Sequence, residues 1–152
     1  MNIKLKVAQP HENQLKDQDL KREFDEIQAL VNQFEYKEDT INLAVIKGIY
    51  KHIERRMTTA CVFINKIGYP IKELHGELRL RFKEKTALIA KATIDFDEMF
   101  IGNLDNDEAL LVHIGLPVKG LEADEIFESN KMSVDFRNIR VAKQQDLSGG
   151  ML

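Results

Sequence analysis

The chain has 152 residues, of which 43% are hydrophobic and 31% are charged, and its formal net charge is -3. This composition is typical of one globular domain and excludes global disorder. The acidic balance disfavours a dedicated nucleic-acid-binding protein, because phosphate contacts usually require an excess of basic residues.

The N-terminal residues predict a short strand with one buried face. Ile3, Leu5 and Val7 alternate with polar residues, whereas a signal peptide needs a continuous apolar stretch. Nowhere does the sequence approach the ~20 apolar residues that span a bilayer. We therefore expect a cytoplasmic protein without a membrane span, unless a leader has been removed.

An amphipathic helix is predicted over about residues 19–34. Its apolar residues recur every three or four positions, so that they form one stripe, and Asp17 or Asp19 can cap its start. Two interpretations are open: the stripe packs on a sheet of the same chain, or it contacts a protein partner or a second copy in a homodimer. The stripe consists of Phe24, Ile27, Leu30, Val31 and Phe34.

From about Thr40 onward the apolar residues alternate with polar ones, which predicts strands. Residues 58–65 are apolar on both faces and therefore indicate a central strand. Residues 11–16 are predicted as a loop, and residues 121–127 are ambiguous and could form one helical turn. The expected strands are residues 3–7, 41–53, 58–65, 78–82, 88–96, 110–116 and 132–141.

The predicted fold class is mainly β with one long amphipathic helix (α+β). About seven strands with frequent turns are typical of an antiparallel β-sandwich of the Ig-like type. A single domain is expected over residues 1–143. Residues 144–152 show no period and are predicted to form a flexible tail.

Acidic residues cluster before and within a predicted turn. The turn from Asp105 to Glu108 lacks the spacing of ligands found in an EF-hand, so a solvated acidic turn is preferred over a weak cation site. The four histidines are scattered without the spacing of a metal site. The single Cys61 cannot form an intramolecular disulfide and is predicted to be a buried core residue. We predict no metal and no cofactor.

Basic residues gather near the end of the strand that begins at about residue 41. His52, Arg55 and Arg56 follow Tyr50, and Glu54 interrupts the run. Basic and aromatic residues together can bind anions or single-stranded nucleic acid. A solvated strand end is the preferred interpretation and an anion contact is the alternative.

The usual signatures of enzymes are missing. No glycine-rich phosphate loop and no nucleophile elbow occurs, so we predict a protein that is not an enzyme. A catalytic site assembled from distant residues would have to draw on the remaining ionisable candidates. These are His52, Arg55, Asp95, Asp97 and His113.

Residues 40–116 resemble the bacterial SLAP (S-layer-associated protein) domain, found in S-layer-associated and accessory-secretion proteins. The resemblance implies a non-catalytic interaction module linked to secretion or the cell envelope. Its motifs, in order, are Val62-Phe63-Ile64-Asn65, Pro70-Ile71, Leu78-Arg79-Leu80, Ile89-Ala90, Phe96-Asp97 and Gly102-Asn103-Leu104.

The sequence therefore predicts a non-catalytic module that binds or scaffolds a protein or peptide. Its binding surface would be the helix stripe or an open sheet edge, which can recruit an additional strand. An export-chaperone-like protein that holds unfolded clients is the alternative.

Overall fold

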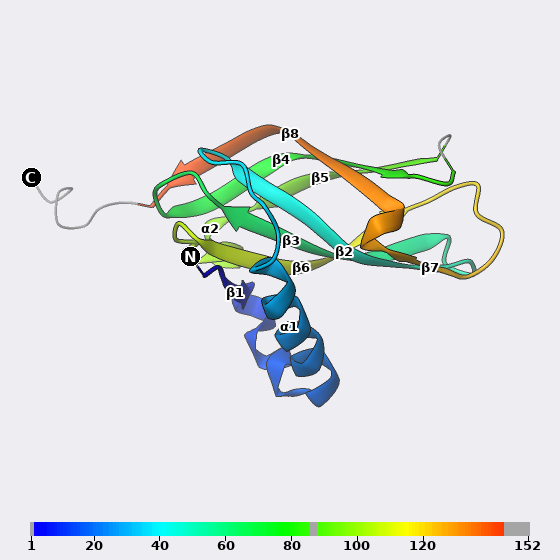
Figure 1. The fold of residues 1–152 in the computed structure, drawn as a ribbon, viewed down its shortest axis with the longest axis horizontal. Coiled ribbons are helices and arrows are strands. Elements are labelled where there is room, and N and C mark those ends of the chain that lie inside the picture. Colours follow the sequence, from blue (N-terminus) through cyan, green and yellow to red (C-terminus); the bar gives the residue numbers. More distant parts are fainter. Residues whose placement is uncertain (1, 86–87, 145–152) are drawn as a thin grey trace, which may run out of the picture.

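The computed structural model describes residues 2–85 and 88–144. Within these residues, eight strands form two sheets, of five and three strands (Figure 1). The larger sheet has the order β1 (Lys4–Val7), β6 (Glu108–Pro117), β3 (Arg56–Asn65), β2 (Ile41–Lys51) and β7 (Glu125–Glu128). The smaller sheet has the order β5 (Ile89–Phe96), β4 (Ile71–Phe82) and β8 (Met132–Lys143). The helical segments are η1 (Gln9–Lys16), α1 (Gln18–Val31), α2 (Glu98–Ile101) and η2 (Ser129–Lys131).

The main core fills the space between the two sheets. Phe63 of β3 and Leu78 and Leu80 of β4 belong to this core, and all three side chains are almost completely buried. The opposite face of β3 is buried as well, because Val62 and Ile64 belong to a second apolar cluster. The prediction of a central strand at residues 58–65 is therefore confirmed.

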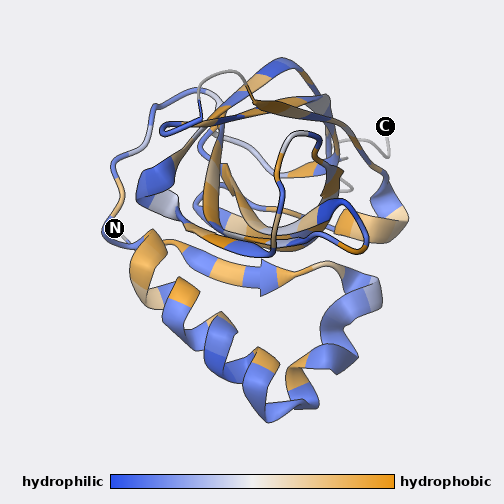
Figure 2. Ribbon diagram, turned by 90° about the vertical axis from the view of Figure 1, so that its right-hand side faces the viewer, coloured by the Kyte–Doolittle hydropathy of each residue, from blue (hydrophilic) through white to orange (hydrophobic). Residues whose placement is uncertain are grey.

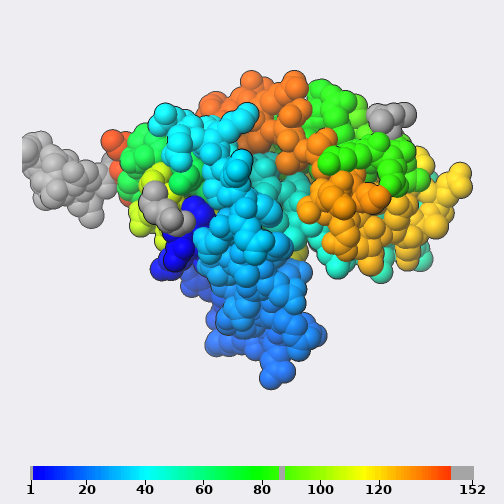
Figure 3. All heavy atoms as spheres, viewed as in Figure 1, coloured from blue at the N-terminus to red at the C-terminus, as the bar shows by residue number. Residues whose placement is uncertain are grey.

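The second cluster lies between α1 and the outer face of the five-stranded sheet. Ile27 and Val31 of α1 are buried there beside Val62 and Leu111. Leu30, on the same predicted stripe, remains 37% exposed. Seen end-on, α1 and η1 form a V below the sheets (Figure 2), and in space-filling view they project from the body as a spur (Figure 3). The helix is thus a third layer that packs mainly through its C-terminal half.

Helix α1 ends at Val31, so the expected end at residue 34 was wrong. Asp17 caps its start by accepting hydrogen bonds from the amides of Asp19 and Leu20. Just after the helix, the Asn32 side chain accepts a hydrogen bond at 2.7 Å from the amide of Ile3, the residue before β1. This tertiary contact leaves Phe34 in the segment between α1 and β2.

Three further expectations about the elements need correction. Strand β1 runs parallel to β6, so the larger sheet is not purely antiparallel. Residues 11–16 belong to the 3-10 helix η1 rather than to a loop. The ambiguous residues 121–127 include most of β7, a strand that was not among the seven expected. In it, Phe127 reaches the main core and Ile126 pairs with Ile49.

The expected C-terminal tail falls mostly outside the described residues. Gln144, its first residue, donates its amide to the Pro70 carbonyl at 2.9 Å, and its side chain contacts Gly102 and Asn103. Residues 145–152 lie beyond the part of the chain that the structure describes.

Candidate functional site

Strand β2 carries an incompletely paired edge. On one side it pairs with β3 over residues 41–51, with a register shift at Ile46, but on the other side β7 is in register only with residues 47–50. Among the described residues, the stretch 43–46 therefore has a strand partner on one side only. In an antiparallel sheet, alternate residues direct both N–H and C=O to the same neighbour. About two donors and two acceptors of this stretch consequently face the open edge.

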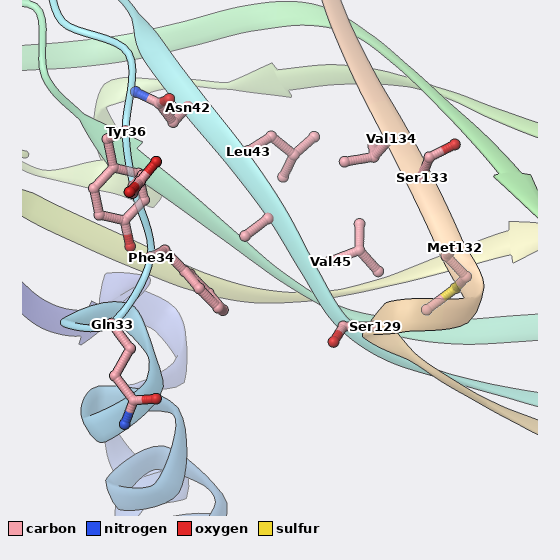
Figure 4. A pocket seen from close by; sticks show the side chains of 12 residues that line it. Gln33, Phe34, Tyr36, Asn42, Leu43, Val45, Ser129, Met132, Ser133 and Val134 are labelled. Atoms are coloured by element: carbon pink, nitrogen blue, oxygen red, sulfur yellow. The ribbon is translucent and has the colours of Figure 1, made fainter.

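A pocket of about 540 Å³ lies over this stretch of β2. Leu43 of β2 and Val134 of β8 point toward one another, while Phe34 and Tyr36 lie on the other side of the β2 ribbon (Figure 4). The pocket thus has an apolar wall on each side of the strand edge. The apolar residues that line it are Phe34, Tyr36, Leu43, Val45, Met132 and Val134.

The pocket continues toward the start of β2. An adjoining hollow of about 330 Å³ shares Asn42, Leu43 and Val134 with it and extends to Lys37 and Arg137. We call the two together the β2–β8 groove. A volume in this range is typical of pockets that bind small ligands.

The wall formed by the segment between α1 and β2 is held in place by hydrogen bonds. Asn42 accepts from the Lys37 amide and donates to the Lys37 carbonyl, each at 2.9 Å. The Tyr36 hydroxyl donates to the Val31 carbonyl at 2.6 Å, and burial raises the pKa of Tyr36 to about 12. This hydroxyl therefore stays protonated and keeps its role as a donor. These hydrogen bonds fix this wall of the groove within the protein itself.

The polar side chains of the groove include the ionisable residues Glu35, Lys37, Asp135 and Arg137. Of the described residues, no histidine or cysteine lines it. The thiol of Cys61 lies in the main core, and burial raises its pKa to about 11, so that it stays a neutral thiol. What the groove offers is main-chain hydrogen bonding between two apolar walls.

The predicted anion contact lies elsewhere, at the hairpin between β2 and β3. His52 donates its amide to Asp124 at 2.8 Å, and its ring contacts the Tyr50 hydroxyl. Arg56 donates to the Gly115 carbonyl at 3.2 Å, and Arg55 is an exposed turn residue with φ of 50°. These side chains gather at one hairpin, but His52 and Arg56 are engaged by neighbours in the same chain.

The residues named for an assembled catalytic site are not brought together. Asp95 on β5 contacts His75, and Asp97 caps α2 by accepting from the Phe100 amide. His113 on β6 contacts Glu23 of α1 at 2.6 Å, on the far side of the other sheet. Together with His52 and Arg55 at the hairpin, they occupy separate parts of the molecule.

The acidic turn is occupied by internal contacts. Asp107 accepts a hydrogen bond from the nearly buried Lys66 at 2.6 Å, and this bond raises the pKa of the lysine. Glu108 accepts from the Asp105 amide at 2.8 Å and lies near Lys6. Within residues 2–85 and 88–144, no group of three or more histidine, cysteine, aspartate or glutamate side chains has an arrangement that could hold a metal ion.

Sequence reasoning missed a charged cluster on the outer face of the three-stranded sheet. The ring of His75 contacts Asp95 at 2.9 Å and Glu73 at 3.1 Å, and these hydrogen bonds, the one with Asp95 first, raise its pKa. The predicted hairpin of residues 78–96 could have found it, because extending its register places His75 opposite Asp95. The groove itself had no comparable signal, since it joins residues about ninety positions apart.

Comparison with known proteins adds no relative. No family model, no curated protein and no solved structure matches this chain. In the described part of the chain, every helix falls short of the length and apolarity needed to cross a bilayer.

Proposed function

We propose that this protein is a non-catalytic module that binds a short extended segment of a partner polypeptide by strand addition to β2. The observation that carries the proposal is the stretch 43–46, which has a strand partner on one side only and borders a groove with apolar walls. Strand addition combines main-chain hydrogen bonds, which give affinity, with pockets for alternate side chains, which give specificity.

The borders of the groove define the segment that it accepts. One end is limited by Lys37, which is tied to Asn42, and the other by β7, which begins to pair at Lys47. About four residues fit between them at the rise of an extended strand, ~3.3 Å per residue. Their side chains would alternate between the wall of Phe34 and Tyr36 and the wall of Leu43 and Val134. We therefore expect a segment that is apolar on both faces, as β3 is.

The expected affinity is modest. Each new main-chain hydrogen bond contributes about 0.5–1.5 kcal/mol, and apolar burial adds roughly 25 cal/mol per Å². Ordering a free segment offsets much of this gain, so dissociation constants on the order of micromolar are expected.

The test is selection from a phage-displayed library of random octapeptides on the immobilised protein. We expect enrichment of peptides with about four consecutive β-branched or aromatic residues. The selected peptides should bind Phe34→Ala about tenfold more weakly, because that variant removes one wall. Leu30→Ala is the matched control, because Leu30 is half-exposed on α1 and lies outside the groove.

A second readout localises the bound peptide on the molecule. Amide hydrogen exchange should slow at residues 43–46 when a selected peptide is added. Enriched peptides that bind Phe34→Ala as tightly as the natural chain, or that leave exchange at residues 43–46 unchanged, would contradict strand addition. A link to secretion or the cell envelope is a further proposal, and it rests on the resemblance of residues 40–116 alone.

A further inference from the structure

The outer face of the three-stranded sheet carries a cluster of positive charge beside the groove. Arg79, Lys91 and Arg137 line a hollow of about 520 Å³ on this face, and we call these three residues the cationic patch. Arg79 lies directly opposite Lys91 in the register of β4 and β5. Like charges in directly opposed positions destabilise a sheet, so an anion at this position would relieve an unfavourable contact.

Carboxylates offset only part of this charge: in the register of β4 and β8, Asp135 lies opposite Arg79 and Glu77 lies opposite Arg137. Among the ion pairs of the described residues, neither Arg79 nor Lys91 has a carboxylate partner. Arg137 contacts Asp135 at 3.3 Å in a solvent-exposed pair, which contributes little. Glu77 also lines the hollow, where it accepts a hydrogen bond from Asn138 at 2.6 Å. Three cationic side chains and one carboxylate line the hollow, so its net charge remains positive.

The cationic patch is continuous with one end of the groove. Arg137 lines both the hollow and the part of the groove that lies beside Lys37 and the start of β2. A polypeptide that leaves the groove at this end therefore meets Lys37 and Arg137 first, and Arg79 and Lys91 beyond the edge of β8.

The direction of the bound segment decides which of its ends reaches these charges. Both β3 and β7 run antiparallel to β2, and a segment at residues 43–46 would continue the line of β7 along the same edge. Antiparallel pairing is also somewhat more stable per residue than parallel pairing. The C-terminal end of such a segment lies at the start of β2, beside Lys37 and Arg137.

We infer that the partner segment carries acidic residues directly after its apolar stretch, and that the cationic patch binds their carboxylates. This inference rests on the proposed function, because it assumes that the apolar stretch occupies the groove. Guanidinium groups pair well with carboxylates, and charges at the rim of an interface mainly set its specificity and its dependence on salt.

The test uses three phage-displayed peptide sub-libraries mixed in equal amounts. Each has four positions randomised among valine, isoleucine, threonine, phenylalanine and tyrosine. In the first, Asp-Asp follows these positions; in the second, Asp-Asp precedes them; in the third, Asn-Asn stands on both sides.

Selection is run on three proteins: the natural chain, the double variant Arg79→Gln with Lys91→Gln, and the control double variant Arg22→Gln with Lys119→Gln. Both pairs of substitutions remove two positive charges, and the control residues are exposed and lie away from the hollow.

We expect the first sub-library to be enriched about three- to tenfold over the others on the natural chain and on the control. The preference should disappear on Arg79→Gln with Lys91→Gln, and it should weaken as salt is raised from 50 to about 500 mM. Equal enrichment of the three sub-libraries would overturn the acidic specificity while leaving strand addition intact, and so would a preference that survives on the variant. A selection in which no peptide is enriched would overturn both proposals.

Discussion

The free edge of β8 and the unpaired stretch of β2 border the same groove, but they differ in chemistry. Strand β8 places Asp135, Arg137 and Arg140 along its exposed edge, and its pairing with β4 is interrupted by two irregularities. Asn138, with φ of 53°, lies at the second of them. Charges and bulges are the features by which natural sheets prevent unwanted strand pairing. Residues 43–46 of β2 have neither a charge nor a proline, although β2 also has one register shift, at Ile46. The charges therefore distinguish the two edges, and the proposed function places the partner strand at the uncharged one.

A third edge, that of β1, is covered by the chain itself. Asn32 and Gln28 of the helical region accept hydrogen bonds from the amides of Ile3 and Leu5, and Gln28 also donates to the Ile3 carbonyl at 2.7 Å. Side-chain amides thus satisfy main-chain groups that another strand would otherwise pair with. Of these three edges, the proposed function uses the one at residues 43–46 of β2, whose side chains are partly or fully buried.

The largest expected effect tests how β8 is attached. A methyl group added at Gly76 would lie 2.5 Å from Cε1 of Phe136 and 3.1 Å from the Arg137 carbonyl oxygen, both on β8. Gly76→Ala should therefore lower the free energy of unfolding by about 2–3 kcal/mol, measured by urea denaturation. At Gly48 of β2 the closest atom is the flexible Met57 sulfur at 2.6 Å, so Gly48→Ala should cost only about 1 kcal/mol. Equal losses would show that β8 is not the more rigidly seated strand.

The two halves of β2 should differ in amide exchange in the free protein. Amides of residues 43–46 that face the open edge lack a strand partner, whereas those of residues 47–50 face β7. We expect the first group to exchange about tenfold faster or more, because they need no opening of a strand pair. Uniform protection across residues 43–50, measured by NMR, would mean that the edge is already covered.

Removing the charges of β8 should make its edge self-associate. Asp135→Thr with Arg137→Thr leaves the net charge unchanged and replaces both residues with a good strand former. We expect the mean mass measured by light scattering to rise with protein concentration, because an unprotected edge pairs with a second copy. The control, Lys21→Thr with Asp25→Thr, removes an exposed ion pair of α1 and should stay unchanged. A variant of β8 that behaves like this control would refute the protective role of its charges.

The smallest expected effect is on the pH dependence of stability and involves the cluster of His75, Glu73 and Asp95. His75 gains two carboxylate partners on folding, which raise its pKa above the ordinary value of 6.5. Its stabilising contribution is therefore fully present below pH 6.5 and is lost as the pH rises through the raised value. Because Asp95 is 65% exposed, we expect less than about 1 kcal/mol. Thermal unfolding across this pH range should show a shallower slope for His75→Gln and for Asp95→Asn. An unchanged slope in both variants would contradict this assignment.

Local pattern predicted the parts of the fold that depend on a single element. The two-residue alternation identified most of the strands, and the apolar residues on both faces of residues 58–65 correctly placed β3 at the centre of a sheet. The pattern failed where a contact with a distant part of the chain determines the local structure. Directly after the helix, the Asn32 side chain bonds to Ile3, the residue before β1. Strand β7 has four residues, too few to show a period, and its Phe127 packs in the main core.

The sequence by itself thus determined that the chain is rich in strands, that one amphipathic helix precedes most of them, and that one strand is buried on both faces. Only the tertiary structure decided where the pairing of β2 with β7 ends and which residues line the groove beside it. Periodicity reports which side of an element is apolar. It does not report which neighbour covers that side or where pairing stops. Here both depend on the chain leaving one sheet after Glu128 and entering the other at Met132.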